Sequence, residues 1–322
     1  MEKTVIDKPS YDNFETPVLI ICYNREAYIE AQLDQIRKVK PVNLFIACDG
    51  PRNSLDAVKV KKVRERYLNL IDWECTIQTN FQEINHGCFK GVKGALDWFF
   101  TYNKEGIILE DDIIPTIDFF LFMEVMLNTY RENNNVFCIS GCNLGYTTPD
   151  SIFTSKIMNM WGWATWSDRF FEVDFNILSW KKVSNKRWFL YKKLRSTIFD
   201  FDWNWIDYWI SIFNDAVENE RYTTWDYQLI YNQIVSGKLT VFPGVNLVRN
   251  LGFDEDATHT KNEQHTAYNL KTHKLNWPIQ IPVKLNPNID FYETVLKERW
   301  AYYKRPNWKY YIGQIIKNCF NY

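Results

Sequence analysis

The sequence predicts an α/β fold, with one domain built on a Rossmann-like mixed sheet and an aromatic, basic C-terminal extension. Its apolar residues come in unbroken runs, such as residues 17–23 and 43–48. Runs without polar alternation are typical of strands buried on both faces, as in parallel sheets. Apolar residues recur at helical spacing between these runs, and this β-α alternation predicts a doubly wound sheet.

The elements can be placed in order along the chain. We expect strands at residues 17–23, 43–48, 74–78, 106–109 and 136–140. We expect helices near residues 29–36, 55–70, 91–100 and 117–131. Residues 151–245 are aromatic-rich and less regular, apart from a helix after Asp226, in which apolar residues share one side.

The composition excludes some classes of protein. The 322 residues are enough for one large domain with a full core. A net charge of -1 lacks the positive excess of a duplex nucleic-acid binder, so no nucleic-acid partner is expected. The seven cysteines are scattered without zinc-site spacing, which favours a reducing compartment. The 14 Trp, 19 Tyr and 22 Phe residues either form a core of large side chains or stack on bases and sugars.

Three consecutive acids, Glu110-Asp111-Asp112, come directly after the strand at 106–109. Ligands of open α/β sheets bind outside the carboxyl ends of the strands, where these acids lie. Their mutual repulsion would be relieved by a divalent cation, and Mg²⁺ and Mn²⁺ prefer oxygen ligands. A metal site and a solvated acidic turn are both open interpretations.

Asp49 ends the strand at 43–48 and is followed by Gly50-Pro51. A carboxylate in this position can accept a hydrogen bond from the N–H of a uracil base. It can equally support a turn through bonds to its own backbone.

Asp226 follows Trp225 and opens a helical run. One interpretation makes it the N-cap of that helix. The other makes it a general base that removes a proton from a hydroxyl group, as glycosyl transfer requires. The two roles are compatible.

Two further segments each allow two interpretations. Residues 252–260 contain Thr258 and His259, which suit either a loop that closes over a diphosphate and its metal or a flexible acidic loop. The cluster of Trp161, Trp163 and Trp166 suits either stacking on an acceptor sugar or a place in the core.

Taken together, these motifs resemble those of GT-A fold glycosyltransferases, among them N-acetylglucosaminyltransferase I and related bacterial polysaccharide glycosyltransferases. The similarity runs along most of residues 16–266. It rests on the first strand at 17–25, on Asp49 at the end of the second, on Glu110-Asp111-Asp112 as the DxD motif, and on Gly162-Trp163, Trp225-Asp226, Gly252-Phe253 and Thr258-His259. The sequence departs from the family in two places: the order Gly252-Phe253 reverses the family's Phe-Gly, and the family's uracil-side His has no clear counterpart, with His86 and Cys88 both possible.

The resemblance implies a role for each matched residue. Asp226 would be the catalytic base, and Asp112 and His259 would hold Mn²⁺ or Mg²⁺. The acceptor would contact Trp161, Gly162 and Trp163. The donor would be bound by Cys22, Tyr23, Asn24, Arg25, Asp49, Lys90, Glu110, Asp111, Trp225 and Thr258.

The resemblance also implies an organisation and an activity. An N-terminal lead (1–15) would precede a nucleotide-sugar-binding half (16–150), an acceptor-binding and catalytic half (151–275) and the C-terminal extension (276–322). The activity would be inverting transfer from a UDP-sugar to a hydroxyl of a glycan or lipid-linked saccharide, in surface polysaccharide synthesis. Two alternatives remain open. One is a sugar nucleotidyltransferase, which needs a Gly-rich loop after the first strand that residues 23–26 do not provide. The other is a non-catalytic glycan-binding or scaffold protein.

Residues 1–4 lack the apolar core that is typical of a signal peptide, and no stretch is long and apolar enough to span a bilayer. A cytoplasmic location is therefore expected. The tail at about 285–322 mixes aromatic and basic residues, which suits three roles. It could lie on the inner face of a membrane, pack on the catalytic domain, or join a second copy in a homo-oligomer.

Overall fold

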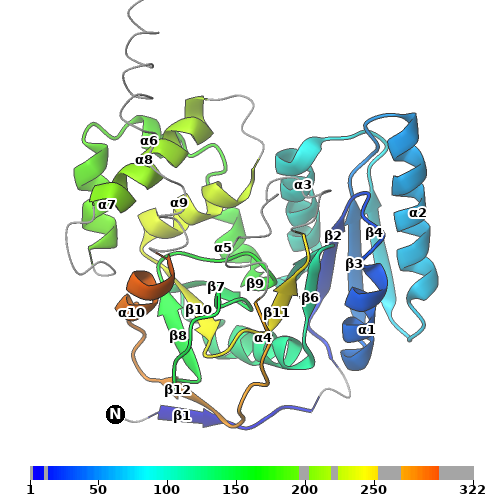
Figure 1. The fold of residues 1–322 in the computed structure, drawn as a ribbon, viewed down its shortest axis with the longest axis horizontal. Coiled ribbons are helices and arrows are strands. Elements are labelled where there is room, and N and C mark those ends of the chain that lie inside the picture. Colours follow the sequence, from blue (N-terminus) through cyan, green and yellow to red (C-terminus); the bar gives the residue numbers. More distant parts are fainter. Residues whose placement is uncertain (1–2, 11–13, 196–202, 219–223, 253–269, 297–322) are drawn as a thin grey trace, which may run out of the picture.

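The computed structural model describes residues 3–10, 14–195, 203–218, 224–252 and 270–296. These residues form a mixed α/β fold around an eight-stranded sheet of order β4-β3-β2-β5-β9-β7-β10-β8 (Figure 1). Two short antiparallel pairs flank the sheet, and they join β1 (Lys3–Ile6) to β12 (Ile279–Pro282) and β6 (Ile113–Pro115) to β11 (Val248–Asn250).

One half of the large sheet is parallel. It consists of β2 (Val18–Cys22), β3 (Asn43–Cys48), β4 (Thr76–Phe81) and β5 (Glu105–Glu110). In the register of these strands, Cys22 lies opposite Cys48, and Cys48 lies opposite Phe81. Ile21 likewise lies opposite Glu110. All four carboxyl ends therefore meet at one edge, which brings the residues after each strand together.

The other half of the sheet is mixed. Strand β9 (Trp163–Trp166) runs antiparallel to both β5 and β7 (Val136–Ser140). Strand β10 (Leu239–Pro243) is parallel to β7, and β8 (Ile152–Ser155) closes the sheet antiparallel to β10. Strands from residues 16–150 and from residues 151–275 thus share one sheet, and the division of the chain at residue 150 stays a prediction.

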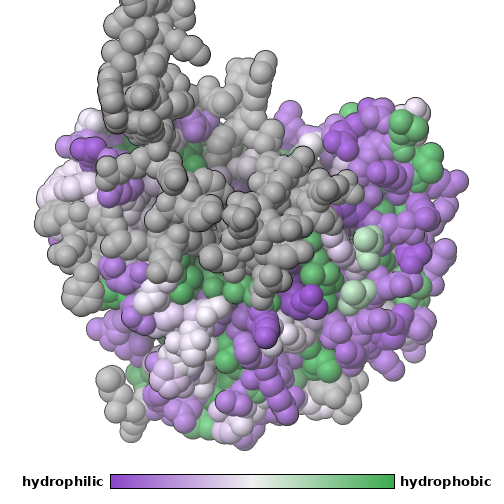
Figure 2. All heavy atoms as spheres, viewed as in Figure 1, coloured by the Kyte–Doolittle hydropathy of each residue, from purple (hydrophilic) through white to green (hydrophobic). Residues whose placement is uncertain are grey.

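Helices α1 (Ile29–Val39), α2 (Ser54–Leu70) and α3 (Gly87–Tyr102) cover the parallel half, because their apolar residues recur on one face. Helix α4 (Ile117–Tyr130) packs on β7 and β9. Helix α2 buries Val60, Val63 and Tyr67 on one face. Its outer face is mostly hydrophilic, at the right of Figure 2. Helix α4 instead buries nearly all of its apolar residues and lies under the centre of the sheet.

A group of helices from the second half of the chain lies away from α1 and α2 (Figure 1). It contains α5 (Ser167–Phe171), α6 (Leu178–Lys181), α7 (Lys186–Leu194), α8 (Trp203–Glu218) and α9 (Asp226–Ser236). Aromatic rings hold this group together: Trp209 stacks on Phe213 at 5.5 Å, and Phe213 meets Trp180 and Tyr231 edge-on. After β12, the short helix α10 (Ile289–Phe291) runs into a π-helical turn over Tyr292–Leu296.

The structure confirms the expected strands and helices of the first half and moves some of their ends. The third strand was expected at 74–78, but β4 runs from Thr76 to Phe81. Helix α3 begins at Gly87, four positions before the expected start at residue 91. The N-cap prediction for Asp226 is wrong, because Trp225 holds that position and Asp226 is the first helical residue.

None of the described helices is both long enough and apolar enough to cross a membrane. Thr258, His259 and Phe253 lie outside the described residues, as does the tail from residue 297 onward. Their predicted roles therefore stay predictions.

Candidate active site

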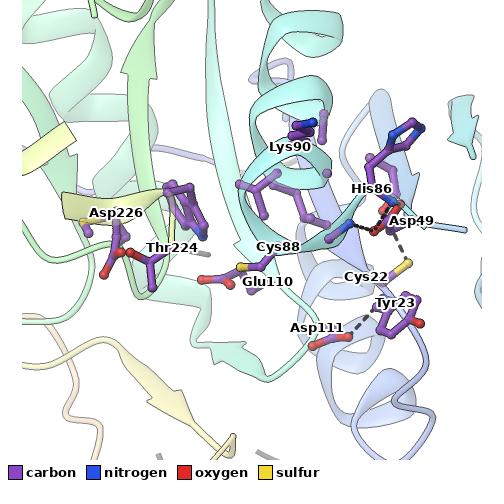
Figure 3. Close-up of a pocket in the computed structure, with 18 of the residues that line it drawn as sticks. Cys22, Tyr23, Asp49, His86, Cys88, Lys90, Glu110, Asp111, Thr224 and Asp226 are labelled. Carbon is purple, nitrogen blue, oxygen red and sulfur yellow. Dashed lines mark hydrogen bonds between the residues drawn. The ribbon is translucent and has the colours of Figure 1, made fainter. Parts of the chain in front are cut away.

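A cavity of about 780 Å³ opens at the edge where the parallel strands end. Its volume falls within the usual range for small-molecule sites. Its walls come from the turns after β2, β3, β4 and β5, from the start of α3, and from the start of α9. Figure 3 shows Asp226 and Thr224 on one wall and Asp49, Tyr23 and Cys22 on the opposite one, with Glu110 and Cys88 between them.

The acid triplet is partly neutralised by one guanidinium group. Arg25 Nη2 lies 2.8 Å from Asp111 Oδ1, and Arg25 Nη1 lies 2.8 Å from Asp112 Oδ2. The backbone N–H of Tyr23 donates to Asp111 Oδ2 at 3.2 Å. Asp111 is thus held on both oxygens by the turn after β2, which makes it a structural anchor between two strand ends.

Burial distinguishes Asp111 and Asp112 from ordinary surface carboxylates. Asp111 and Asp112 are 3% and 9% exposed. Burial raises the pKa of Asp111 to about 7, although the Arg25 charge opposes the rise. Burial also raises the pKa of Glu110 well above its usual range, and the charges of Asp112 and Asp111 add to the shift. A protonated Glu110 can donate a hydrogen bond to a ligand as well as accept one.

Asp49 is held by the residues that begin α3. Its Oδ1 accepts from the backbone N–H groups of Gly50 and His86, both at 2.9 Å. Its Oδ2 accepts from Gly87 N at 2.9 Å and from the Asn85 amide at 3.0 Å. A carboxylate has about four acceptor positions, so these bonds use them all. The geometry therefore favours an anchoring role for Asp49, and its bond to uracil stays a prediction.

Tyr23 and Asn24 turn their polar groups toward Asp56 at the start of α2. The Tyr23 hydroxyl donates to Asp56 Oδ2, and Asn24 Nδ2 donates to Asp56 Oδ1 at 2.7 Å. Arg52 donates to the same carboxylate through its backbone N–H at 3.0 Å and its Nε at 3.1 Å. Burial of Asp56 alone would raise its pKa, but these bonds hold it well below its usual range.

The cavity also contains polar residues that the sequence did not single out. Arg52, Asn80, Gln82 and Asn85 line it beside the predicted donor-binding residues. Asn80 and Gln82 were missed because the third strand was predicted to end at residue 78, whereas β4 continues to Phe81. The rule that found Asp49 and Glu110, to look just beyond a strand end, would have found Gln82 with the correct boundary.

Cys88 and Lys90 lie in the first turn of α3 and face the same cavity. Burial raises the pKa of the Cys88 thiol to about 12, and the charges of Glu110, Asp226 and Asp49 add to the rise. All three carboxylates therefore lie near one thiol. Lys90 is exposed and makes no ion pair with any described residue, which leaves its charge available to an anionic ligand.

On the opposite wall, Trp225 and Asp226 line the cavity together with Trp161. Trp163 is 1% exposed and stacks on Trp225 at 6.1 Å. Neither Trp163 nor Gly162 belongs to the cavity wall. Of the three predicted acceptor contacts, Trp161 is thus placed to touch a ligand. Trp163 supports Trp225 from behind, and Trp166 is buried in the core.

The described residues contain no group of three or more His, Cys, Asp or Glu side chains arranged to hold a metal. Mg²⁺ and Mn²⁺ are nevertheless often held by one or two carboxylates, with phosphate and water supplying the remaining ligands. Asp112 fits that mode. Its Oδ2 is taken by Arg25, and its Oδ1 makes no hydrogen bond to the described part of the chain.

No protein-family model and no curated protein matches the chain. Among solved structures, it is similar to the mannosyltransferase PcManGT from Pyrobaculum calidifontis in complex with GDP-Man and Mn²⁺, at 15% identity and a TM-score of 0.33. That match covers 51% of this chain and 48% of the other. S. aureus TarS matches at 15% identity and a TM-score of 0.35, over 50% of this chain and 30% of that one.

The chain therefore spans less than half the length of either solved structure. Both TM-scores are below 0.5, so neither similarity carries weight for the activity. What the protein does has to be inferred from the residues of the cavity.

Proposed function

We propose that the protein is an inverting, metal-dependent glycosyltransferase of the GT-A type. It transfers a hexose or N-acetylhexosamine from a UDP-sugar to a hydroxyl of a glycan or lipid-linked saccharide, in surface polysaccharide synthesis. One observation carries the proposal: Asp226 and the acid triplet line the same cavity, and Glu110 lies between Asp226 and the wall that holds Tyr23 and Asp49. Transfer needs these two things together, a carboxylate for the acceptor and a separate site for the donor diphosphate.

The donor lies on the wall made by β2, β3, β5 and α3. Asp49 already uses the N–H groups that open α3, so an anion gains little from that helix end. The diphosphate charge is instead met by Arg25, Arg52 and Lys90, three cations on the cavity wall. Glu110 reaches the donor sugar's hydroxyls. A metal held by Asp112 would offset charge on the departing diphosphate.

Asp226 acts on the acceptor from the other wall. Its carboxylate accepts the proton of the acceptor hydroxyl while the hydroxyl oxygen forms a bond to the anomeric carbon. The bond between that carbon and the diphosphate oxygen breaks, and the electron pair leaves with the nucleoside diphosphate. Because base and leaving group lie on opposite sides of the sugar, the anomeric configuration inverts. Trp161 offers an aromatic face beside the base, on which an acceptor sugar can stack.

The substitution Asp226→Asn tests the base. The amide keeps the shape of the carboxylate but cannot take the proton, so transfer should fall by about 10²–10⁴-fold. Sugar transfer from UDP-sugars is measured over a panel of saccharide acceptors, with UDP affinity measured by calorimetry in parallel. UDP affinity should stay unchanged, because the proposed donor contacts other than Trp225 lie away from Asp226, and the substitution leaves Trp225 in place.

Asp34→Asn is the matched control, since Asp34 is an exposed surface residue of α1 that pairs with Arg37. It should leave both measurements at the wild-type level. Near-normal transfer by the Asp226→Asn variant would refute the base assignment. Product formation from a nucleoside triphosphate and a sugar-1-phosphate would instead identify a nucleotidyltransferase.

A further inference from the structure

The guanidinium group of Arg25 places a positive charge beside the acid triplet, where a metal is expected. Arg25 contacts Asp111 and Asp112 through separate nitrogens, each at 2.8 Å. The Arg25 side chain is 23% exposed, and the Asp112 side chain is 13% exposed. A charge-assisted bond at this distance between partly buried groups is stronger than an exposed surface pair.

The backbone at Gly252 closes the far side of this ion pair. A Cβ atom at position 252 would lie 2.0 Å from Asp112 Oδ2 and 3.1 Å from Arg25 Nη1. The N–H of Leu251 also donates to the Asp112 carbonyl at 2.9 Å. The Asp112 carboxylate therefore lies between Arg25 and the backbone of Gly252, and a cation that binds it approaches with the guanidinium close.

We infer that Arg25 weakens the binding of a free divalent cation to Asp112, so that the metal enters this site together with the donor diphosphate. A divalent ion on Asp112 would lie within a few ångströms of the guanidinium, and like charges at that range repel strongly. The diphosphate brings negative charge to the same place and offsets the repulsion. Arg25 is thus a positioning residue that couples the two ligands. The inference rests on the proposed function for the metal on Asp112 and for the identity of the anion.

The test is a titration of Mn²⁺ alone, followed by electron paramagnetic resonance, into the wild type and Arg25→Gln. Without the guanidinium, Asp112 should bind free Mn²⁺ at least about tenfold more tightly. Arg25→Lys keeps the charge and should stay within about threefold of the wild type. Arg37→Gln is the control, because Arg37 also contacts two aspartates but lies on the surface, on Asp34 and Asp72. Unchanged or weaker Mn²⁺ binding by Arg25→Gln would overturn the inference.

A second measurement covers the case in which Arg25→Gln folds poorly. Removing the guanidinium leaves two buried carboxylates uncompensated, so the Tm in EDTA should fall below that of the wild type. Mn²⁺ should restore the Tm of Arg25→Gln while leaving that of Arg37→Gln unchanged. No restoration would count against the inference. The double variant Arg25→Gln/Asp112→Asn should lose the gain in Mn²⁺ affinity.

Repeating the Mn²⁺ titration of the wild type with UDP separates this inference from the proposed function. Tighter Mn²⁺ binding with UDP supports the coupling. If no UDP-sugar is turned over but Arg25→Gln still gains Mn²⁺ affinity, the proposed function fails and the role of Arg25 stands. If UDP-sugars are turned over but the variant gains nothing, the role of Arg25 fails alone.

Discussion

The two walls of the cavity are held in place by different forces. The wall that we propose for the donor, called the donor wall here, is a polar network, in which Asp49, Asp56 and Asp111 each bind several backbone or side-chain groups of neighbouring turns. The wall that we propose for the acceptor, called the acceptor wall, is held by apolar packing, with Trp225 stacked on the buried Trp163. Polar networks fix orientation but depend on charge, whereas packed aromatic rings contribute mainly through the area they bury. Substitutions on the two walls should therefore differ in size and in pH dependence.

The largest expected effect is on the packing behind the acceptor wall. Trp163→Ala removes a side chain that is 1% exposed and should lower the free energy of unfolding by about 3–5 kcal/mol. Urea denaturation measures the loss, which should be the same at pH 5 and pH 8 because no charge is removed. The control is Trp188→Ala, since Trp188 is 47% exposed. A similar loss in both variants would mean that burial does not explain the stability of this wall.

The second-largest effect on stability is expected on the donor wall, at the start of α3. Asp49→Ala leaves the N–H groups of His86 and Gly87 without their acceptor, and this should cost about 2–3 kcal/mol. Hydrogen exchange should locate the loss in the first turn of α3. Asp97→Ala on the same helix is the control, because Asp97 pairs with Lys93 on the surface. Unchanged protection of His86 and Gly87 would show that Asp49 does not anchor the helix.

The smallest effect depends on pH. The folded pKa of Asp56 lies below its unfolded value, so its contribution is present above about pH 4 and is lost as the pH falls further. Asp56→Asn should therefore cost about 1.5 kcal/mol at pH 7, and the difference from the wild type should shrink between pH 4 and pH 2. Glu65→Gln, an exposed change on the same helix, should show neither effect. A difference that stays constant with pH would contradict the assignment.

The sequence predicted the donor wall far better than the acceptor wall. Long apolar runs placed β2, β3 and β5, and the strand-end rule then placed Asp49 and Glu110 at one edge. The short strands β8 and β9 have four residues each, too few to show a period amid aromatic sequence. The contact of Trp163 with Trp225 joins positions that sequence spacing cannot relate.

Two parts of the donor wall could not be predicted either. Arg25 was assigned to the donor by resemblance, but its ion pairs with Asp111 and Asp112 depend on how the turns after β2 and β5 meet in space. For Asp49, the sequence left the base contact and the turn equally open. The bond from Gly50 belongs to that turn, whereas the bonds from His86 and Gly87 to Asp49 could not be predicted because α3 begins four positions before its expected start.

Gly252 has a consequence for how this chain can vary. Its backbone lies against Asp112 and Arg25, and even one methyl group there would overlap the carboxylate oxygen. A larger residue at position 252 therefore requires the Asp112 carboxylate to move, which would disturb its ion pair with Arg25. Residues at positions 25, 112 and 252, which are far apart in the sequence, therefore constrain one another. An engineer who changes the charge of this turn would have to consider all three positions together.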